Sequence, residues 1–170
     1  MHIVIELDRQ RLRLLAEDGA LLREYPVSTA ARGAGEQRGS YQTPRGRHVI
    51  RAKIGAGAPR GAVFVGRRWT GECCTPESWA AKPDRDWILT RILWLSGCEV
   101  GLNRRGDVDT MRRYIYIHGT PGAVELGKPG SHGCVRMNND DLIELFDRVP
   151  AGTPVNIVEH SQKESACAQQ

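Results

Sequence analysis

Alternating apolar and polar residues near the start of the chain predict a meander of short β-strands. Three segments, 2–7, 11–17 and 21–29, carry apolar residues at every second position or in short runs, which is the pattern of half-buried strands. The second connection contains Asp18-Gly19, a pair typical of tight hairpin turns. These opening segments are therefore expected to pair with one another as antiparallel neighbours.

The same pattern predicts further strands along the rest of the chain. We expect them over residues 47–53, 62–65, 87–95, 113–118 and 154–159. Periodicity is lost over 66–86 and 97–112, so these two segments are expected to be loops, with one helical turn near 76–81.

One clear helix is predicted, shortly after residue 137. Asn138 or Asn139 can cap its first turn, and the two aspartates that follow favour the positive end of the helix dipole. Its apolar face consists of Leu142, Ile143, Leu145 and Phe146. Many strands with one clear helix predict a mainly β fold, a β-sandwich or barrel-like sheet, that carries its site on loops.

Size and charge favour one ordinary domain. The chain has 170 residues, enough to bury a core, and we assign residues 1–160 to the domain and expect the polar segment 161–170 to be a disordered tail. Its 24 basic and 20 acidic residues give a net charge of +4 and are spread along the sequence. Because no polybasic run or basic-aromatic pattern is present, nucleic acid is not expected as a partner.

The N-terminal segment and the cysteines bear on the compartment. Residues 1–6 read as a strand, without the basic and apolar regions of an export signal. The longest apolar run, 87–95, contains Arg91 and is too short to span a bilayer. The odd count of five cysteines fits a reducing compartment. We therefore expect a cytoplasmic protein without a membrane anchor, or a periplasmic one if an export signal has been removed.

Candidate chemistry is concentrated in two short segments, His-Gly-Thr at 118–120 and Ser-His-Gly-Cys-Val-Arg-Met at 131–137. The thiol of Cys134 is a nucleophile only as a thiolate, and a free cysteine with a pKa of about 8.5 is mostly protonated near neutrality. A histidine is the usual acceptor of that proton. His118 and His132 are both candidates.

Strand periodicity favours His118. Over 114–118 a period of two places Tyr114, Tyr116 and His118 on one face of the strand. Ile115 and Ile117 lie on the other face and are expected to point into the core. The face with the tyrosines and the histidine is then free to line a cleft.

Two glycines flank the candidate chemistry. Gly119 allows the backbone to turn sharply or to approach a ligand closely. Gly133, between His132 and Cys134, leaves room for a substrate carbonyl, and its N–H, together with that of Cys134, can stabilise an oxyanion.

Together these residues resemble the signature of the L,D-transpeptidases, the YkuD-domain enzymes of peptidoglycan metabolism that include ErfK-, YbiS-, YcfS- and YnhG-like proteins. The resemblance extends over roughly residues 2–159 and includes Thr-Pro-Arg-Gly at 43–46. It implies a β-rich fold with Cys134 as the nucleophile and His118 as its base, held by the backbone carbonyl of Gly119.

The resemblance also implies roles for neighbouring residues. His132 and Gly133 would support the thiolate and the oxyanion site, and Arg136 would hold a substrate carboxylate or keep the loop in place. Ser131 and Tyr116 are further candidates for substrate contact.

The implied reaction is acyl transfer at an L,D-peptide bond of a peptidoglycan stem tetrapeptide or muropeptide. Cys134 would attack the carbonyl of the third residue, usually meso-diaminopimelate, and form a thioester while His118 protonates the departing D-alanine. Lowering the cysteine pKa by about two units needs only roughly 2.7 kcal/mol of preferential thiolate stabilisation. No metal or other cofactor is required, and carbapenem-type covalent inhibitors are expected to acylate the cysteine.

Several alternatives remain open at this point. A cytoplasmic setting favours water as the acyl acceptor, an L,D-carboxypeptidase activity in murein recycling, over the formation of 3-3 cross-links in the cell wall. A remote alternative is a zinc-dependent hydrolase, with His118, His132 and Cys134 joined by Cys73 or Cys74, since these ligand types suit zinc. Another is an inactive module that binds peptidoglycan fragments.

Overall fold

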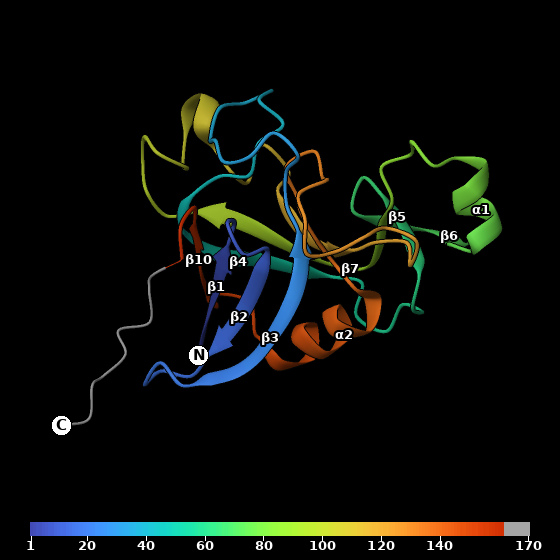
Figure 1. The fold of residues 1–170 in the computed structure, drawn as a ribbon, viewed down its shortest axis with the longest axis horizontal. Helices are drawn as coiled ribbons and strands as arrows, with labels where there is room; N and C mark the ends of the chain where they lie inside the picture. Colours follow the sequence, from blue (N-terminus) through green and yellow to red (C-terminus); the bar gives the residue numbers. More distant parts are fainter. Residues whose placement is uncertain (162–170) are drawn as a thin grey trace.

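The computed structural model describes residues 1–161 and is dominated by β-strands (Figure 1). The strands are β1 (His2–Glu6), β2 (Arg11–Leu15), β3 (Leu21–Ser28), β4 (Gly46–Ile54), β5 (Ala62–Val65), β6 (Arg68–Cys73), β7 (Ile88–Gly97), β8 (Tyr116–Gly119), β9 (Val135–Met137) and β10 (Pro154–Val158). The helices are α1 (Pro76–Ala81) and α2 (Asn139–Arg148), with a 3-10 turn at Gly106–Val108.

The strands form one sheet that closes on itself. Their spatial order is β4-β10-β1-β2-β3-β9-β8-β7-β5-β6, and β4 pairs with β7 as well as with β10. The ring therefore runs from β4 to β7 and back, and the β5–β6 hairpin continues the sheet beyond β7. The mainly β, barrel-like fold expected from the sequence is confirmed.

The core is built from alternating strand residues and from one face of α2. Ile3 and Ile5 of β1 and Leu12 and Leu14 of β2 are fully buried, as the period of two predicts. Three residues of α2 join the same cluster, namely Leu142, Leu145 and Phe146.

Hydrogen bonds close both ends of helix α2. The Asn138 side chain accepts hydrogen bonds from the backbone N–H groups of Asp140 and Asp141, which is an N-cap. The Val149 N–H then closes the last turn on Leu145. Ile143, which the sequence placed on the same apolar face, is half-buried.

Several strands differ from the sequence expectation, and β9 was not among the predicted strands. β6 forms in the segment expected to be a loop, and all of its residues are exposed, so it has no apolar alternation that could predict it. Its pairing follows from a tight turn after β5, in which Gly66 and Arg67 both have positive φ. β8 begins at Tyr116 rather than at residue 113, since Tyr114 has a left-handed backbone with φ of 57°.

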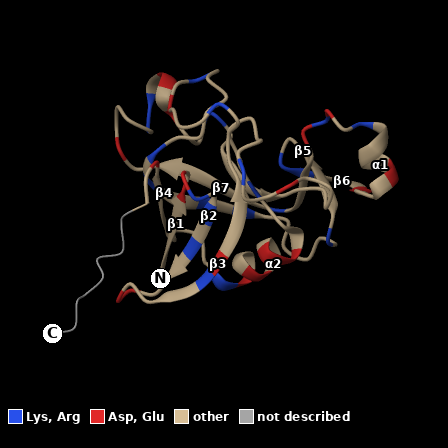
Figure 2. Cartoon of the chain, in the orientation of Figure 1, with Lys and Arg blue, Asp and Glu red and all other residues tan. Residues whose placement is uncertain are grey.

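The surface carries charges of both signs. Basic and acidic residues are interspersed over strands, loops and helices (Figure 2).

Neither helix in the described part of the chain has the length and apolar content needed to cross a bilayer. Ser161, the first residue of the expected tail, donates hydrogen bonds from its N–H and its hydroxyl to Asp8, while the expected disorder of the other tail residues lies outside the described residues.

Candidate active site

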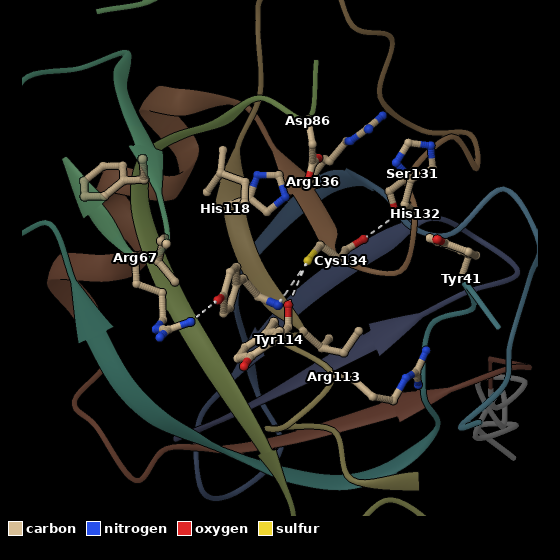
Figure 3. Close-up of a pocket in the computed structure, with 16 residues that line it drawn as sticks. Tyr41, Arg67, Asp86, Arg113, Tyr114, His118, Ser131, His132, Cys134 and Arg136 are labelled. Atoms are coloured by element: carbon tan, nitrogen blue, oxygen red, sulfur yellow. Dashed lines mark hydrogen bonds between the residues drawn. The ribbon is translucent and has the colours of Figure 1, made fainter. Parts of the chain in front are cut away.

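Two parallel strands bring the candidate residues together. β8 and β9 pair with Ile117 opposite Val135 and His118 opposite Arg136, so Cys134, the residue before β9, lies beside Tyr116. A cavity of about 440 Å³ opens over this junction and is lined by Tyr116, Ser131 and His132 as well as by His118, Cys134 and Arg136. All the side chains predicted for the site therefore face one cavity (Figure 3).

The alternation of side chains between the two faces of β8, expected from the sequence, is confirmed. Ile115 and Ile117 belong to the main hydrophobic core. Tyr116 and His118 point to the opposite side and line the cavity. The same alternation that buries the isoleucines thus delivers the histidine to the nucleophile.

The thiol of Cys134 rests on main-chain groups of the preceding strand. The Tyr116 N–H donates to Sγ over 3.3 Å, and the thiol donates to the Tyr114 carbonyl over 3.4 Å. Removal from water raises the pKa of the Cys134 thiol to about 12, a shift that the Tyr116 N–H opposes and the Asp86 carboxylate increases. The resting thiol is therefore neutral, and the expectation of a lowered pKa is wrong for this state.

His118 is oriented so that its outer nitrogen is free to act as a base. Nδ1 lies 2.7 Å from the Gly119 carbonyl, and because a carbonyl only accepts hydrogen bonds, Nδ1 carries the proton. Nε2 therefore has the lone pair. Burial lowers the pKa of His118, while the Gly119 carbonyl and Asp86 act in the opposite direction, so the resting imidazole is neutral.

Gly119 is needed for close packing rather than for a sharp turn. A Cβ at this position would overlap Oδ1 of Asn139 and lie 2.7 Å from the Leu89 carbonyl oxygen. Asn139, at the start of α2, accepts from the Thr90 hydroxyl over 2.6 Å and donates to the Thr120 carbonyl over 3.1 Å. This buried network fixes the backbone that orients His118.

Hydrogen bonds within the loop hold Cys134 in place. The Ser131 hydroxyl donates to the Cys134 carbonyl over 2.6 Å and accepts from the Gly133 N–H over 3.2 Å. Ser131 is buried and organises the turn, and because it also lines the cavity, its contact with substrate stays a prediction. The Gly133 N–H, expected to face an oxyanion, is engaged by Ser131 in this state.

The other expected residues differ in how tightly they are held. His132 is exposed at the cavity rim, edge-on to Tyr41 with ring centroids 6.1 Å apart. Arg136 donates to the Gly130 carbonyl over 3.0 Å, which is the loop-holding contact expected of it. Its charge also lowers the pKa of both His118 and Cys134.

Sequence patterns did not identify several residues around this site. The Thr43 hydroxyl donates to the Gly133 carbonyl and accepts from the Ala30 N–H, and Arg113 donates to the carbonyls of residues 35, 36 and 42 and to the Ser40 hydroxyl. Asp86 and Arg67 line the cavity from other loops. Thr43 had a signal, the Thr-Pro-Arg-Gly segment, whereas Asp86 and Arg67 are brought in by distant turns.

The ligand set of the zinc alternative is not assembled. Within residues 1–161, no group of three or more His, Cys, Asp or Glu side chains is placed to hold a metal ion. Cys74 lines a different cavity, beside Trp79 and Pro121. Each of the four cysteines at positions 73, 74, 98 and 134 is a free thiol.

Comparison with known proteins identifies the family. The model of the YkuD family, the L,D-transpeptidase catalytic domain, matches residues 1–157. The chain belongs to this family. The resemblance carried by residues 118–120 and 131–137 is thereby confirmed.

Individual relatives agree with this assignment. A putative L,D-transpeptidase YkuD of Bacillus licheniformis is 28% identical over 157 residues, 92% of this chain and 64% of the relative. The probable L,D-transpeptidase ErfK/SrfK of Escherichia coli is 45% identical over 51 residues, which cover 30% of this chain and 16% of that protein.

Solved structures show the same fold. L,D-transpeptidase 3 of Mycobacterium tuberculosis, in complex with a faropenem-derived adduct, aligns with a TM-score of 0.54 at 20% identity and covers 92% of this chain and 59% of that one. The chain therefore spans less than two thirds of the length of each of these three relatives.

Proposed function

We propose that this protein hydrolyses peptidoglycan stem tetrapeptides at the bond between meso-diaminopimelate and D-alanine, through a thioester on Cys134. The observation that carries the proposal is the shared cavity of the Cys134 thiol and the unblocked Nε2 of His118. A thiol and a correctly oriented imidazole are the minimal parts of cysteine acyl transfer. Membership of the L,D-transpeptidase family supports this choice of bond.

The neutral resting pair sets the order of proton transfers. As Sγ attacks the carbonyl carbon of the third stem residue, its proton moves to Nε2 of His118 and the carbonyl oxygen becomes negative. The tetrahedral intermediate collapses when Nε2 returns that proton to the D-alanine nitrogen and the C–N bond breaks. A thioester on Cys134 and free D-alanine result.

The second half reaction uses the same nitrogen. Nε2 takes a proton from water, the resulting hydroxide attacks the thioester carbonyl, and the C–S bond breaks as the thiol regains its proton. The Gly119 carbonyl and the nearby Asp86 charge favour the transient imidazolium in both halves. Arg113 and Arg136 stabilise the negative charge that develops on the sulfur of Cys134 and on the substrate oxygen during the reaction.

The charges of the cavity support water over an amine as the acceptor. Arg67, Arg113 and Arg136 face the cavity with Asp86 as the acidic residue among its lining. A surplus of positive charge disfavours the approach of an ammonium group. Asp86, exposed at the rim, is the feature that favours the second candidate, L,D-transpeptidation to a 3-3 cross-link, because a carboxylate can receive an acceptor amine.

The cytoplasmic setting expected from the sequence belongs to the same proposal. Free thiols at all four described cysteines fit a reducing compartment, in which murein fragments recovered from the wall would be the substrate. Cell fractionation with an antibody against the protein tests this part on its own.

Mass spectrometry of products from a disaccharide tetrapeptide tests the activity. We expect tripeptide and D-alanine in equal amounts, a transient mass increase on the protein, and no turnover by Cys134→Ala. Cross-linked dimers without tripeptide would replace hydrolysis by transpeptidation. Turnover that persists in Cys134→Ala, or that a strong chelator abolishes, would contradict the thioester mechanism.

An inactive binding module gives a different result in the same assay. It would bind the tetrapeptide without turnover and would not be acylated by a carbapenem. We expect the carbapenem to add its mass to the wild-type protein and to leave Cys134→Ala unmodified.

A further inference from the structure

Arg67 occupies an unusual position at the edge of the cavity. It lies at the tip of the β5–β6 hairpin, where both turn residues, Gly66 and Arg67, have positive φ. Such turns strongly prefer glycine or asparagine, because other residues crowd their Cβ there. Arginine is therefore unfavourable for the backbone conformation of this turn. Its presence there indicates a role for its side chain.

The guanidinium of Arg67 is held on an aromatic surface with hydrogen-bonding capacity to spare. It lies 4.6 Å from the centroid of the Trp94 ring and 5.2 Å from that of Tyr114. Nη1 donates to the Tyr116 hydroxyl over 3.2 Å. Among the described residues this is its one hydrogen bond, and no carboxylate pairs with it, so the other N–H groups of the guanidinium have no protein acceptor there.

The other two arginines of the cavity differ in how many hydrogen bonds they donate. Arg113 donates four hydrogen bonds to the 35–42 loop, and Arg136 donates to Gly130. Arg67 and Arg136 thus each donate one hydrogen bond and have donors left for a ligand, but Arg67 is the one of the three whose guanidinium lies over aromatic rings. A guanidinium held over aromatic rings is suited to bidentate recognition of a carboxylate.

Tyr116 lies between the Arg67 guanidinium and the Cys134 thiol and contacts both. Its backbone N–H contacts Sγ of Cys134, and its hydroxyl contacts Nη1 of Arg67. The guanidinium and the thiol therefore contact opposite ends of Tyr116. A carboxylate at the end of a long side chain of the acyl-donor residue reaches that far, whereas the terminal carboxylate of the leaving D-alanine stays close to the scissile bond.

We propose that Arg67 is a specificity-determining residue that binds the free side-chain carboxylate of the acyl-donor residue, that of diaminopimelate in the proposed reaction. The inference rests on the proposed function. It goes beyond it by predicting that the protein distinguishes a free side-chain carboxylate from its carboxamide. Arg67 acts on binding and orientation and takes no part in proton transfer.

The test compares three stem tetrapeptides with the wild-type protein. One carries free diaminopimelate, one its side-chain carboxamide, and one a carboxamide at the terminal D-alanine instead. We expect kcat/KM to be about 10- to 100-fold higher for the free acid than for the side-chain amide, the range of a hydrogen bond to a charged group. Arg67→Gln should lower kcat/KM for the free acid by the same factor and change that for the side-chain amide less than about threefold.

Two further variants separate recognition from folding. Arg67→Gly relieves the left-handed backbone, so it should keep or raise the melting temperature and still lose the preference. Arg68→Gln, an exposed neighbour in β6, removes the same charge next to the turn and should keep the preference.

The outcomes are distinguishable from failure of the proposed function. If the wild-type protein turns over none of the peptides, the proposed function fails and Arg67 is not the reason. If turnover occurs but Arg67→Gln lowers kcat/KM equally for acid and side-chain amide, Arg67 is structural and the inference is overturned. Loss of a preference for the terminal carboxylate instead would also overturn it.

Discussion

At the residue scale, the neutral state of Cys134 has a kinetic consequence. Burial raises its pKa to about 12, so at neutral pH the thiol holds its proton more tightly than an ordinary cysteine does. Alkylation by iodoacetamide should therefore be slow at pH 7 and should keep rising through pH 10. The rate, followed by mass spectrometry of the Cys134 peptide, should show no plateau near neutrality.

Cys98 and His118 provide the controls for this measurement. Cys98 is exposed and should be alkylated faster than Cys134 at neutral pH in the same sample. His118→Ala should abolish turnover while changing the alkylation profile little, because in the resting structure the thiol donates to Tyr114 rather than to the imidazole. A pH-independent rate above about pH 6 would indicate a thiolate and contradict the neutral pair.

The chemistry of single residues was predictable where it is local. Cys134, His118 and the Gly119 carbonyl lie within two short segments, and strand parity decided which histidine faces the thiol. The hydrogen bonds of the Ser131 hydroxyl were not predicted, because its partners are main-chain groups of its own turn. Arg67 could not be recognised, since nothing near it in sequence shows which part of the fold it reaches.

At the element scale, the close contact between β8 and α2 requires a glycine at position 119, because there is no room for a side chain. A methyl group on Gly119 would overlap Asn139 and press on the Leu89 carbonyl. Gly119→Ala should therefore destabilise the protein by about 1–3 kcal/mol, the usual cost of overpacking. It should also lower kcat, because the carbonyl that orients His118 must move. Urea unfolding and turnover of the tetrapeptide measure the two effects.

Gly122 is the matched control for that substitution. It lies three residues further along, and a Cβ built on it meets nothing within 4 Å. Gly122→Ala should leave both stability and kcat close to the wild-type values. Equal effects of the two substitutions would show that the Gly119–Asn139 contact does not position His118.

Elements were predictable where they bury an apolar pattern. β1, β2 and α2 carry a period that marks their inner face, and their positions follow from it. β6 has no buried face and depends on the turn that joins it to β5, so periodicity was uninformative. Its tip nevertheless carries Arg67, which shows how a functional residue can lie in the least predictable element.

At the scale of the whole molecule, closure of the sheet could not be read from the sequence. β4 lies between β10 and β7, with His48 opposite Val155 on one side and Gly97 on the other. These partners are far apart along the chain, and alternation within a strand predicts its faces but not its neighbours. A mainly β fold followed from the pattern, whereas the ring depended on long-range pairing.

His48 makes this closing strand sensitive to acid. Its Nδ1 donates to the Gly46 carbonyl and its Nε2 accepts from the Thr110 hydroxyl, and burial lowers its pKa from 6.5 to about 4. Because the unfolded chain binds the proton more readily, stability is full above pH 6.5 and falls as the pH drops toward 4. The histidine alone should remove about 3 kcal/mol of unfolding free energy between pH 7 and pH 4.

Urea unfolding of wild-type protein and His48→Gln at several pH values isolates this contribution. The carboxylates and His118 titrate in both proteins, so the difference between the two pH profiles belongs to residue 48. His48→Gln should be less stable at pH 7, because it loses the fitted imidazole between Gly46 and Thr110. Its stability should then fall less steeply on acidification, so that the two curves converge toward pH 4. Parallel curves would mean that His48 is protonated as easily in the folded barrel as in the unfolded chain, and acid sensitivity would then have to arise elsewhere in the fold.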